Sequence, residues 1–152
     1  MLILIDTSIV VRAVETGHRD HSAATNALRE LRQAGHGLFV VPQIHYEFWV
    51  VATRPVDQNG LGMSTAVADA ELARLAPPLF RLLQDERAIY GEWRRLVSQH
   101  DVKGKKAHDT RLAAAAKRHA LTHILTFNAG DFGRYSEITV LTPADVLTQT
   151  LP

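Results

Sequence analysis

The chain has 152 residues, of which 46% are hydrophobic and 22% charged, and it contains no cysteine. This composition predicts one globular domain over residues 1–152 and excludes a disulfide framework, a thiolate nucleophile and a cysteine-based zinc site. The net charge of +1 at pH 7 does not by itself indicate a nucleic-acid-binding protein.

Short apolar runs alternate with longer capped or periodic segments along the chain. We expect strands at Leu2–Ile5 and at residues 38–41, 79–83, 123–127 and 138–141. We expect helices after Asp6 through Val14, at residues 20–33, 42–52, 64–75, 85–99 (capped by Asp85) and 109–119, a turn or short helix from Asp131, and a last helix from Pro143. This alternation favours an α/β fold, a three-layer sandwich around a mostly parallel five-stranded sheet.

No apolar run approaches the roughly twenty residues that a membrane-spanning helix needs. The N-terminal segment MLILIDTS reaches Asp6 before an apolar run long enough for a signal peptide, and no basic segment precedes it. We therefore expect a cytoplasmic protein.

The basic residues are unevenly distributed. Residues 103–119 contain all four lysines and six basic side chains in total, against the single acid Asp109. Such a local face can attract phosphates although the whole chain is near neutral. Judged on charge alone, a solvated helix face with its loop is the more ordinary explanation.

Three aspartates lie at strand ends or helix starts. Asp6 directly follows the first strand, Asp131 lies a few residues after the fourth, and Asp109 opens the alanine-rich helix. Each has an ordinary structural explanation, because aspartate is favoured as a helix N-cap and in the first helical turn.

Glu47 is harder to explain in this way. Its helix reads QIHYEFWVVA and is apolar on nearly all sides, which predicts a largely buried helix. An ionised glutamate there is costly unless it is paired or bound to a cation, and Arg54 lies too far along for a one-turn pair. Alternatively, Glu47 lies on a narrow exposed stripe of the helix together with Gln43 or His45. The sequence favours neither interpretation over the other.

Acids at strand ends and helix starts of a parallel sheet can converge on one edge. Converging carboxylates raise each other's pKa unless a cation lies among them. Oxygen ligands without a cysteine or a clear histidine pair suit Mg²⁺ or Mn²⁺, and such ions activate water for attack on phosphate. The acids in question are Asp6, Glu47, Asp109 and Asp131.

Signatures of several other activities are missing. The sequence contains neither GxGxxG nor GxxxxGK(S/T), so dinucleotide and P-loop nucleotide binding are unsupported. GxSxG and HExxH are also absent, which argues against an α/β-hydrolase and a zincin. A metal-dependent phosphatase is less favoured because Asp6 is followed by Thr-Ser and not by a second acid two positions on.

Four segments carry a likeness to a known family: LILIDTSIVV at the start, the glutamate in the helix after VVPQ, AHDTRLAAAA, and LTFNAGDF near the end. In order and spacing they resemble the PIN-domain ribonucleases, and among them the VapC-like toxins of bacterial toxin–antitoxin pairs. The resemblance covers almost the whole chain. It implies a five-stranded, mostly parallel sheet between helices, a homodimer, and a small VapB-like antitoxin as partner.

The resemblance also implies roles for individual residues. It assigns Asp6, Glu47, Asp109 and Asp131 to catalysis through a bound Mg²⁺ or Mn²⁺. Ser8 and Thr126 match hydroxyl positions that support these acids, and Asn128 could share the task of Asp131, whose position varies most in the family. We expect Lys103, Lys105, Lys106 and Arg111 to steer the RNA backbone. The leading hypothesis is thus a metal-dependent endoribonuclease, and the alternative is a non-catalytic module of the same fold that binds RNA or a protein.

Overall fold

The computed structural model describes residues 1–149, which fold around a five-stranded sheet with the strand order β3-β2-β1-β4-β5. The strands are β1 (Leu2–Ile5), β2 (Gly37–Val40), β3 (Arg81–Leu82), β4 (His123–Leu125) and β5 (Thr139–Leu141). Each neighbouring pair is parallel, and Ile3 of β1 lies between Leu38 of β2 and His123 of β4. The predicted α/β class is therefore confirmed, with a sheet that is parallel throughout.

The strand order reverses at the centre of the sheet. The chain passes from β1 to β2 and β3 on one side, and then returns to place β4 and β5 on the other side. In parallel α/β sheets, ligands bind beyond the carboxyl ends of the strands at such a reversal. Asp6 directly follows β1 and Thr126 directly follows β4, so both lie at this edge.

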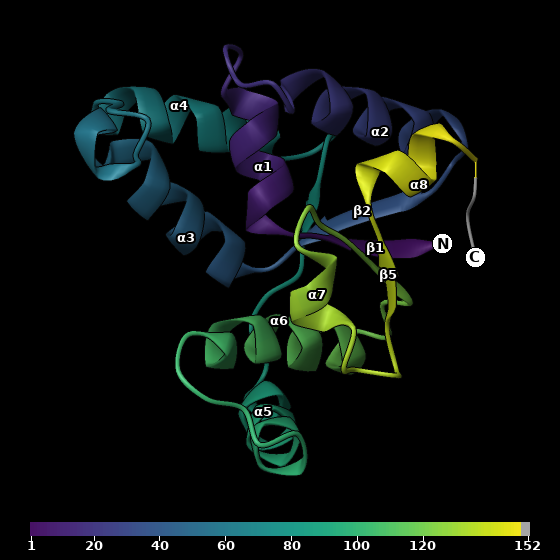
Figure 1. Cartoon of the computed structure of the whole chain (residues 1–152). Coiled ribbons are helices and arrows are strands. Elements are labelled where there is room, and N and C mark those ends of the chain that lie inside the picture. The colour runs from purple at the N-terminus through teal and green to yellow at the C-terminus, as the bar shows by residue number, and fades with distance from the viewer. Residues whose placement is uncertain (150–152) are drawn as a thin grey trace.

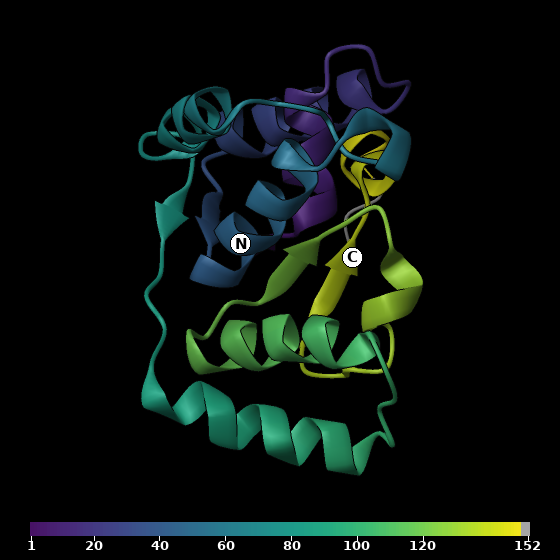
Figure 2. The ribbon, with the colours of Figure 1, turned by 90° about the vertical axis from the view of Figure 1, so that its left-hand side faces the viewer.

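Helices cover both faces of the sheet (Figures 1 and 2). They are α1 (Thr7–Val14), α2 (His21–Gln33), α3 (Pro42–Thr53), α4 (Thr65–Leu75), α5 (Arg87–Gln99), α6 (Lys106–Arg118), α7 (Ala129–Phe132) and α8 (Pro143–Leu147), with a 3₁₀ turn η1 (Val56–Gln58). Figure 1 shows α1, α2, α3, α4 and α8 on one side of the sheet and α6 and α7 on the other, with α5 packed outside α6. The predicted three layers are thus present.

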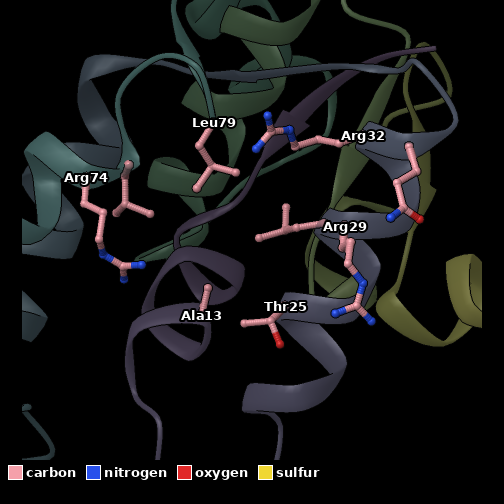
Figure 3. A pocket seen from close by; sticks show the side chains of 9 residues that line it. Ala13, Thr25, Arg29, Arg32, Arg74 and Leu79 are labelled. Carbon is pink, nitrogen blue, oxygen red and sulfur yellow. The ribbon is translucent and has the colours of Figure 1, made fainter.

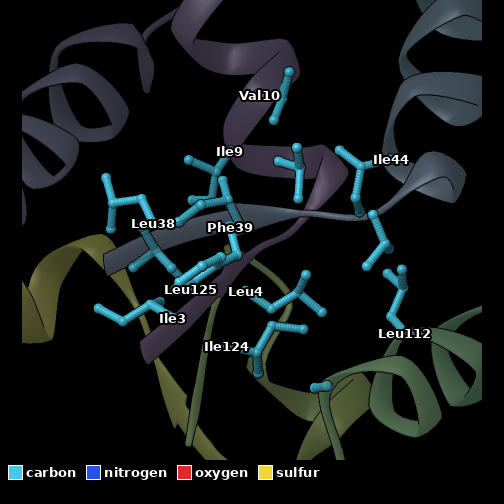
Figure 4. Close-up of a cluster of buried hydrophobic side chains, with 14 of the residues drawn as sticks. Ile3, Leu4, Ile9, Val10, Leu38, Phe39, Ile44, Leu112, Ile124 and Leu125 are labelled. Carbon is cyan, nitrogen blue, oxygen red and sulfur yellow. The ribbon is translucent and has the colours of Figure 1, made fainter. Parts of the chain in front are cut away.

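The core lies on both faces of the central strands (Figure 4). Leu4 and Ile124 are fully buried, as expected for parallel strands covered by helices on either side. Ile9 of α1 and Ile44 of α3 pack on one face, and Leu112 of α6 packs on the other. This packing fixes the starts of α1, α3 and α6 against the carboxyl edge of the sheet.

Local sequence explains how the helices next to this edge begin. The Asp6 carboxylate accepts a hydrogen bond from the Thr7 N–H, which satisfies one of the free donors at the start of α1. Pro42 occupies the first turn of α3, where its missing N–H costs nothing. Gly35 ends α2 with a φ of +78°, a conformation that residues with a Cβ rarely adopt.

Two predicted boundaries are wrong in instructive ways. The third strand shrinks from residues 79–83 to Arg81–Leu82, an exposed edge pair. Asp85 does not cap α5, because the N-cap residue is Glu86 and the Asp85 carboxylate pairs with Arg111 of α6 at 2.8 Å. A tertiary ion pair has displaced the local capping role. Across the described residues, no helix is long and apolar enough to span a bilayer.

Candidate functional site

Asp6 is buried beneath the carboxyl edge of the sheet, with 6% of its surface exposed. Its Oδ1 accepts the Thr7 N–H at 2.8 Å. Its Oδ2 accepts the Ser8 hydroxyl at 2.6 Å and the Thr126 hydroxyl at 2.7 Å. Three donors thus hold one carboxylate in a single orientation.

The two hydroxyls are themselves held by the turn that follows β4. Ser8 Oγ accepts the Phe127 N–H at 3.2 Å, and Thr126 Oγ1 accepts the Asn128 N–H at 2.9 Å. Ser8 and Thr126 therefore contact Asp6, as the resemblance implies. The Asn128 side chain makes no cap to α7, and this residue is exposed.

Burial raises the pKa of the Asp6 carboxyl above its ordinary value. The hydrogen bonds from Ser8, Thr126 and Thr7 work against this rise, while the nearby charge of Glu47 adds to it. The site thus combines burial, which disfavours the carboxylate, with aligned donors, which favour it.

Glu47 lies half-buried on α3 and is held by two neighbours. Its Oε2 accepts the Thr7 hydroxyl at 2.5 Å, and its Oε1 accepts the Gln43 amide N–H at 2.7 Å. The structure decides between the two interpretations left open by the sequence: Glu47 shares its side of the helix with Gln43, but that side faces the site and Gln43 itself is buried.

Gln43 connects Glu47 to the other side of the sheet. Its amide nitrogen also donates to the His108 carbonyl at 2.9 Å, and its Oε1 accepts from Arg111 at 3.0 Å. The Arg111 guanidinium pairs in turn with Asp85 at 2.8 Å. Arg111, expected to steer RNA, is therefore engaged within the protein and fixes the position of α6 relative to α3.

Asp109 and Asp131 face the same region from α6 and α7. Burial, together with the charges of Asp131, Asp6 and Glu47 in that order, raises the pKa of Asp109 to about 6, while the neighbouring His108 works against the rise. Within residues 1–149, neither the Asp109 nor the Asp131 side chain makes a hydrogen bond or ion pair with the protein. The acids are thus close enough to repel one another.

The arrangement fits a hard divalent cation in its chemistry. In residues 1–149 no lysine or arginine forms an ion pair with any of the four acids, so their charges are not neutralised by the protein. No three His, Cys, Asp or Glu side chains in this part of the chain are gathered tightly enough to hold a metal ion. The four acids therefore face one region of the sheet edge without forming a compact cluster of ligands.

The lysines that were predicted to steer the RNA backbone form no ion pair with the four acids in residues 1–149. Lys105 and Lys106 are exposed at the start of α6, three or four residues before Asp109. Lys103 is also exposed and pairs with Asp101 at 3.0 Å. Two residues that were not predicted as site residues, Thr7 and Gln43, contact Glu47 directly; Gln43 was considered only as its neighbour on an exposed stripe. Gln43 lies one helical turn before Glu47, a spacing that could have identified it.

Two hollows flank the acids, and a third lies apart from them. One, of about 490 Å³, is lined by Thr7 and Ser8 of α1 together with residues of η1 and its loop. The other, also about 490 Å³, includes Glu47, Gln43 and His108. A separate apolar pocket of about 420 Å³ between α1, α2 and α4 contains none of the four acids and is surrounded by Arg29, Arg32 and Arg74 (Figure 3).

The fold is shared with solved toxin structures. VapC20 of Mycobacterium tuberculosis, described as a sarcin–ricin-loop-cleaving toxin, aligns over 90% of this chain and 96% of its own, with 17% identity and a TM-score of 0.68. VapBC2 from Rickettsia felis, bound to a DNA fragment from its promoter, aligns over 93% and 98%, with 16% identity and a TM-score of 0.68. FitAcB from Neisseria gonorrhoeae aligns over 94% and 99%, with 22% identity and a TM-score of 0.64.

These likenesses show a common fold, while the sequence itself matches a family. No protein of curated function matches the chain by sequence. The model of the PIN domain family, however, matches residues 3–138, which include all four candidate acids. The resemblance inferred from the sequence is therefore confirmed, and the chain belongs to the PIN domain family.

Proposed function

We propose that this protein is a metal-dependent endoribonuclease and the toxin of a toxin–antitoxin pair. The observation that carries the proposal is the Asp6 carboxylate at the reversal of strand order, where three donors orient it and the charges of Glu47 and Asp109 lie near. Carboxylates that face one region raise each other's pKa, and a divalent cation among them would remove this repulsion. The family and the toxin structures that share its fold support the same activity.

Asp6, Glu47, Asp109 and Asp131 are the proposed metal ligands, and oxygen ligands of this kind suit Mg²⁺ or Mn²⁺. When bound, the ion would activate a water for attack on the phosphodiester and stabilise the charge that develops on the phosphate. The chain's own contribution differs between the acids. Asp6 and Glu47 are fixed by hydrogen bonds, whereas the side chains of Asp109 and Asp131 make no hydrogen bond or ion pair in residues 1–149 and are free to turn toward a cation.

The proposed substrate is RNA, in keeping with a cytoplasmic toxin. Lys105 and Lys106 are exposed close to Asp109 and form no ion pair within the described chain, so they are available for phosphates. Lys103 and Arg111 are already paired, with Asp101 and Asp85 respectively, so any part they take in RNA binding requires those pairs to open.

The proposed partner is a small VapB-like antitoxin, and the proposed assembly is a homodimer. Several proteins of this fold were solved as toxin–antitoxin complexes. The apolar pocket between α1, α2 and α4 supports a protein partner, because buried Leu28 and Leu75 are among its lining residues. Three arginines, Arg29, Arg32 and Arg74, also line it (Figure 3). An amphipathic segment with acidic side chains would complement both features.

Cleavage of RNA by purified protein tests the proposal. The native chain should cut single-stranded RNA in Mg²⁺ or Mn²⁺ but not in EDTA, and Asp109→Asn should abolish cutting while the protein stays folded. Asp69→Asn is the matched control, because Asp69 is an exposed aspartate on α4, outside the acid cluster. Full activity of Asp109→Asn with metal present contradicts the mechanism, and metal-independent RNA binding without cleavage would favour the non-catalytic alternative.

A further inference from the structure

We propose that α5 carries a stacking site for a base of single-stranded RNA, next to the site of cleavage. The inference rests on the proposed function and deepens it, because it names how the substrate is held beyond the reacting phosphate. The site consists of the rings of Tyr90 and Trp93 with the cations around them, and we call it the aromatic platform.

The two rings of the platform lie against each other on the outer surface of α5. Their centroids are 5.8 Å apart and their planes are inclined by 29°. Tyr90 is 64% exposed although its ring stacks on Trp93, so one face of the pair is open to solvent. Both rings line a hollow of about 500 Å³ together with Ile89, Arg87, Glu86 and Arg111. A ring pair open to solvent offers a π-face to any base.

The platform is rigid on the side that faces the proposed active site. The Trp93 indole N–H donates to the carbonyl of Ala107 at 2.9 Å, which fixes the ring against the first turn of α6. Asp109 lies two residues further along that turn. Ile89 and Leu96, which share the inward side of α5 with Trp93, are buried, so the helix cannot roll to hide Tyr90 without exposing them.

The platform is also connected to Glu47 through hydrogen bonds. Arg111 lines the hollow and donates to Gln43 at 3.0 Å, and Gln43 donates to Glu47 at 2.7 Å. Two side-chain hydrogen bonds therefore separate the platform from a proposed metal ligand. A nucleotide on the platform would lie close to the cleaved phosphodiester along the same strand.

Basic side chains lie next to the rings, and Arg87, which lines the hollow, forms no ion pair within residues 1–149. Arg87 and Arg94 lie three residues before and four residues after Tyr90, so all three share one face of α5. Across residues 87–111 there are seven basic side chains against three acidic ones. Arg87, Arg94, Lys105 and Lys106 form no ion pair within residues 1–149, whereas Arg95, Lys103 and Arg111 do. Aromatic rings among free cations match a polyanion that carries flat bases.

A second copy of the chain is a poorer occupant of this surface. A two-fold contact between α5 helices would place each platform against its own symmetry mate. Arg87 and Arg94 would then face the same cations across the interface, and like charges in contact weaken association. The excess of positive charge favours a nucleic acid over a self-complementary interface.

Binding to two RNA-like probes tests the platform. The background is Asp109→Asn in EDTA, so that no cleavage occurs. One probe is a fluorescein-labelled oligoadenylate, and the other is an oligomer with the same number of phosphates but abasic sugars. Tyr90→Ala should weaken binding of oligoadenylate by roughly tenfold, a typical loss for one stacked base, and leave the abasic probe unchanged. Tyr90→Phe should bind both probes like the background protein, because the ring remains.

Two further variants separate stacking from charge and from exposure. Arg94→Ala should weaken both probes equally and lower the salt dependence of binding, since it removes a phosphate contact. Val67→Ala on α4 removes a side chain that is 48% exposed and should change the binding of neither probe.

Fluorescence gives an independent readout. Replacing Trp49 by Phe leaves Trp93 as the single tryptophan of the chain, and oligoadenylate should quench its fluorescence.

The following results would contradict the proposal that the aromatic platform binds a base. Equal losses for the two probes, or no loss with Tyr90→Ala, exclude base stacking at this place. A change of sedimentation coefficient with Tyr90→Ala shows that the rings form a subunit interface instead. If the native chain cuts RNA but Tyr90→Ala binds oligoadenylate normally, only the platform is wrong. If the native chain neither cuts nor binds RNA, the proposed function is wrong as well.

Discussion

The hydroxyl of Thr126 donates to Oδ2 of Asp6 at 2.7 Å and joins two strand ends that are 120 positions apart in the sequence. Both residues are buried at the place where the strand order reverses. The hydroxyl therefore does two things at once: it closes the edge between β1 and β4, and it orients the carboxylate that we propose as the central metal ligand.

Thr126→Val tests this double role with little change in side-chain volume. The substitution removes a donor from Asp6 and an acceptor from the Asn128 N–H. We expect a loss of about 1–3 kcal/mol in the free energy of unfolding, because buried polar groups lose a partner. We also expect metal affinity to fall roughly 10–100-fold, as for other groups that orient ligands. Denaturant titration and calorimetry with Mn²⁺ measure the two effects.

Thr139→Val is the control for this substitution. Thr139 is exposed on the neighbouring strand β5, so its replacement should change stability by no more than about 0.5 kcal/mol. If Thr126→Val keeps native metal affinity, Asp6 is oriented sufficiently by Ser8 and Thr7, and Thr126 is structural only.

Gln43 is the second position that deserves a test, because it positions Glu47 without being an acid. Gln43→Leu removes the 2.7 Å hydrogen bond to Glu47 and separates Arg111 from α3. We expect RNA cleavage to fall by roughly 10–100-fold. Raising the Mn²⁺ concentration should restore part of the activity, because a displaced ligand weakens metal binding. Gln58→Leu, at an exposed position in η1, should cleave normally. Unchanged cleavage by Gln43→Leu would mean that Thr7 alone holds Glu47.

The sequence allowed the positions of Asp6 and Asp109 to be predicted because their roles depend on local order. An aspartate that follows a buried strand and precedes a helix lies at the carboxyl edge of a parallel sheet, whichever neighbour that strand acquires. The same local order places Asp109 in the first turn of α6, although that helix begins at Lys106, three residues earlier than expected.

Other features depend on which strands and helices come into contact, and local sequence patterns do not contain that information. The contact of Thr126 with Asp6 requires β4 to lie beside β1. The ion pair of Asp85 with Arg111 joins the segment after β3 to α6, a contact that only the tertiary fold determines. The interpretation of Glu47 likewise depended on Gln43 being buried by neighbours that come from α6.

The raised pKa of Asp109 predicts how the metal-free protein responds to pH. The folded carboxyl has a pKa of about 6 against 3.8 for the ordinary group. Between these values the folded state binds more protons than the unfolded state, so the free energy of unfolding should fall as pH rises from about 4 to 6. The upper bound is about 3 kcal/mol, and solvent screening of this half-exposed group reduces it to roughly 1 kcal/mol. Denaturant titrations in EDTA across this range measure the loss.

Asp109→Asn should remove the part of that pH dependence that comes from Asp109, leave the part that comes from the raised pKa of Asp6, and stabilise the metal-free protein at pH 7 by a similar amount. The substitution keeps the shape of the side chain and removes its charge, which the other three acids repel. Asp69→Asn, on the exposed face of α4, should leave the slope unchanged. An Asp109→Asn variant that is less stable than the native chain at pH 7 would show that this carboxylate has a favourable partner, against the repulsion described here.

A divalent ion should reverse the sign of this response. Metal ligands must be deprotonated, so affinity for Mn²⁺ rises with pH through the range in which Asp109 loses its proton. An ion that binds only the folded state stabilises it by mass action, by about 2.7 kcal/mol at a concentration a hundred times its Kd. This exceeds the repulsion among the acids, so in saturating Mn²⁺ the melting temperature should increase from pH 5 to 7, whereas in EDTA it should decrease. The same slope with and without Mn²⁺ would mean that no ion binds among these carboxylates, and the mechanism built on them would fail.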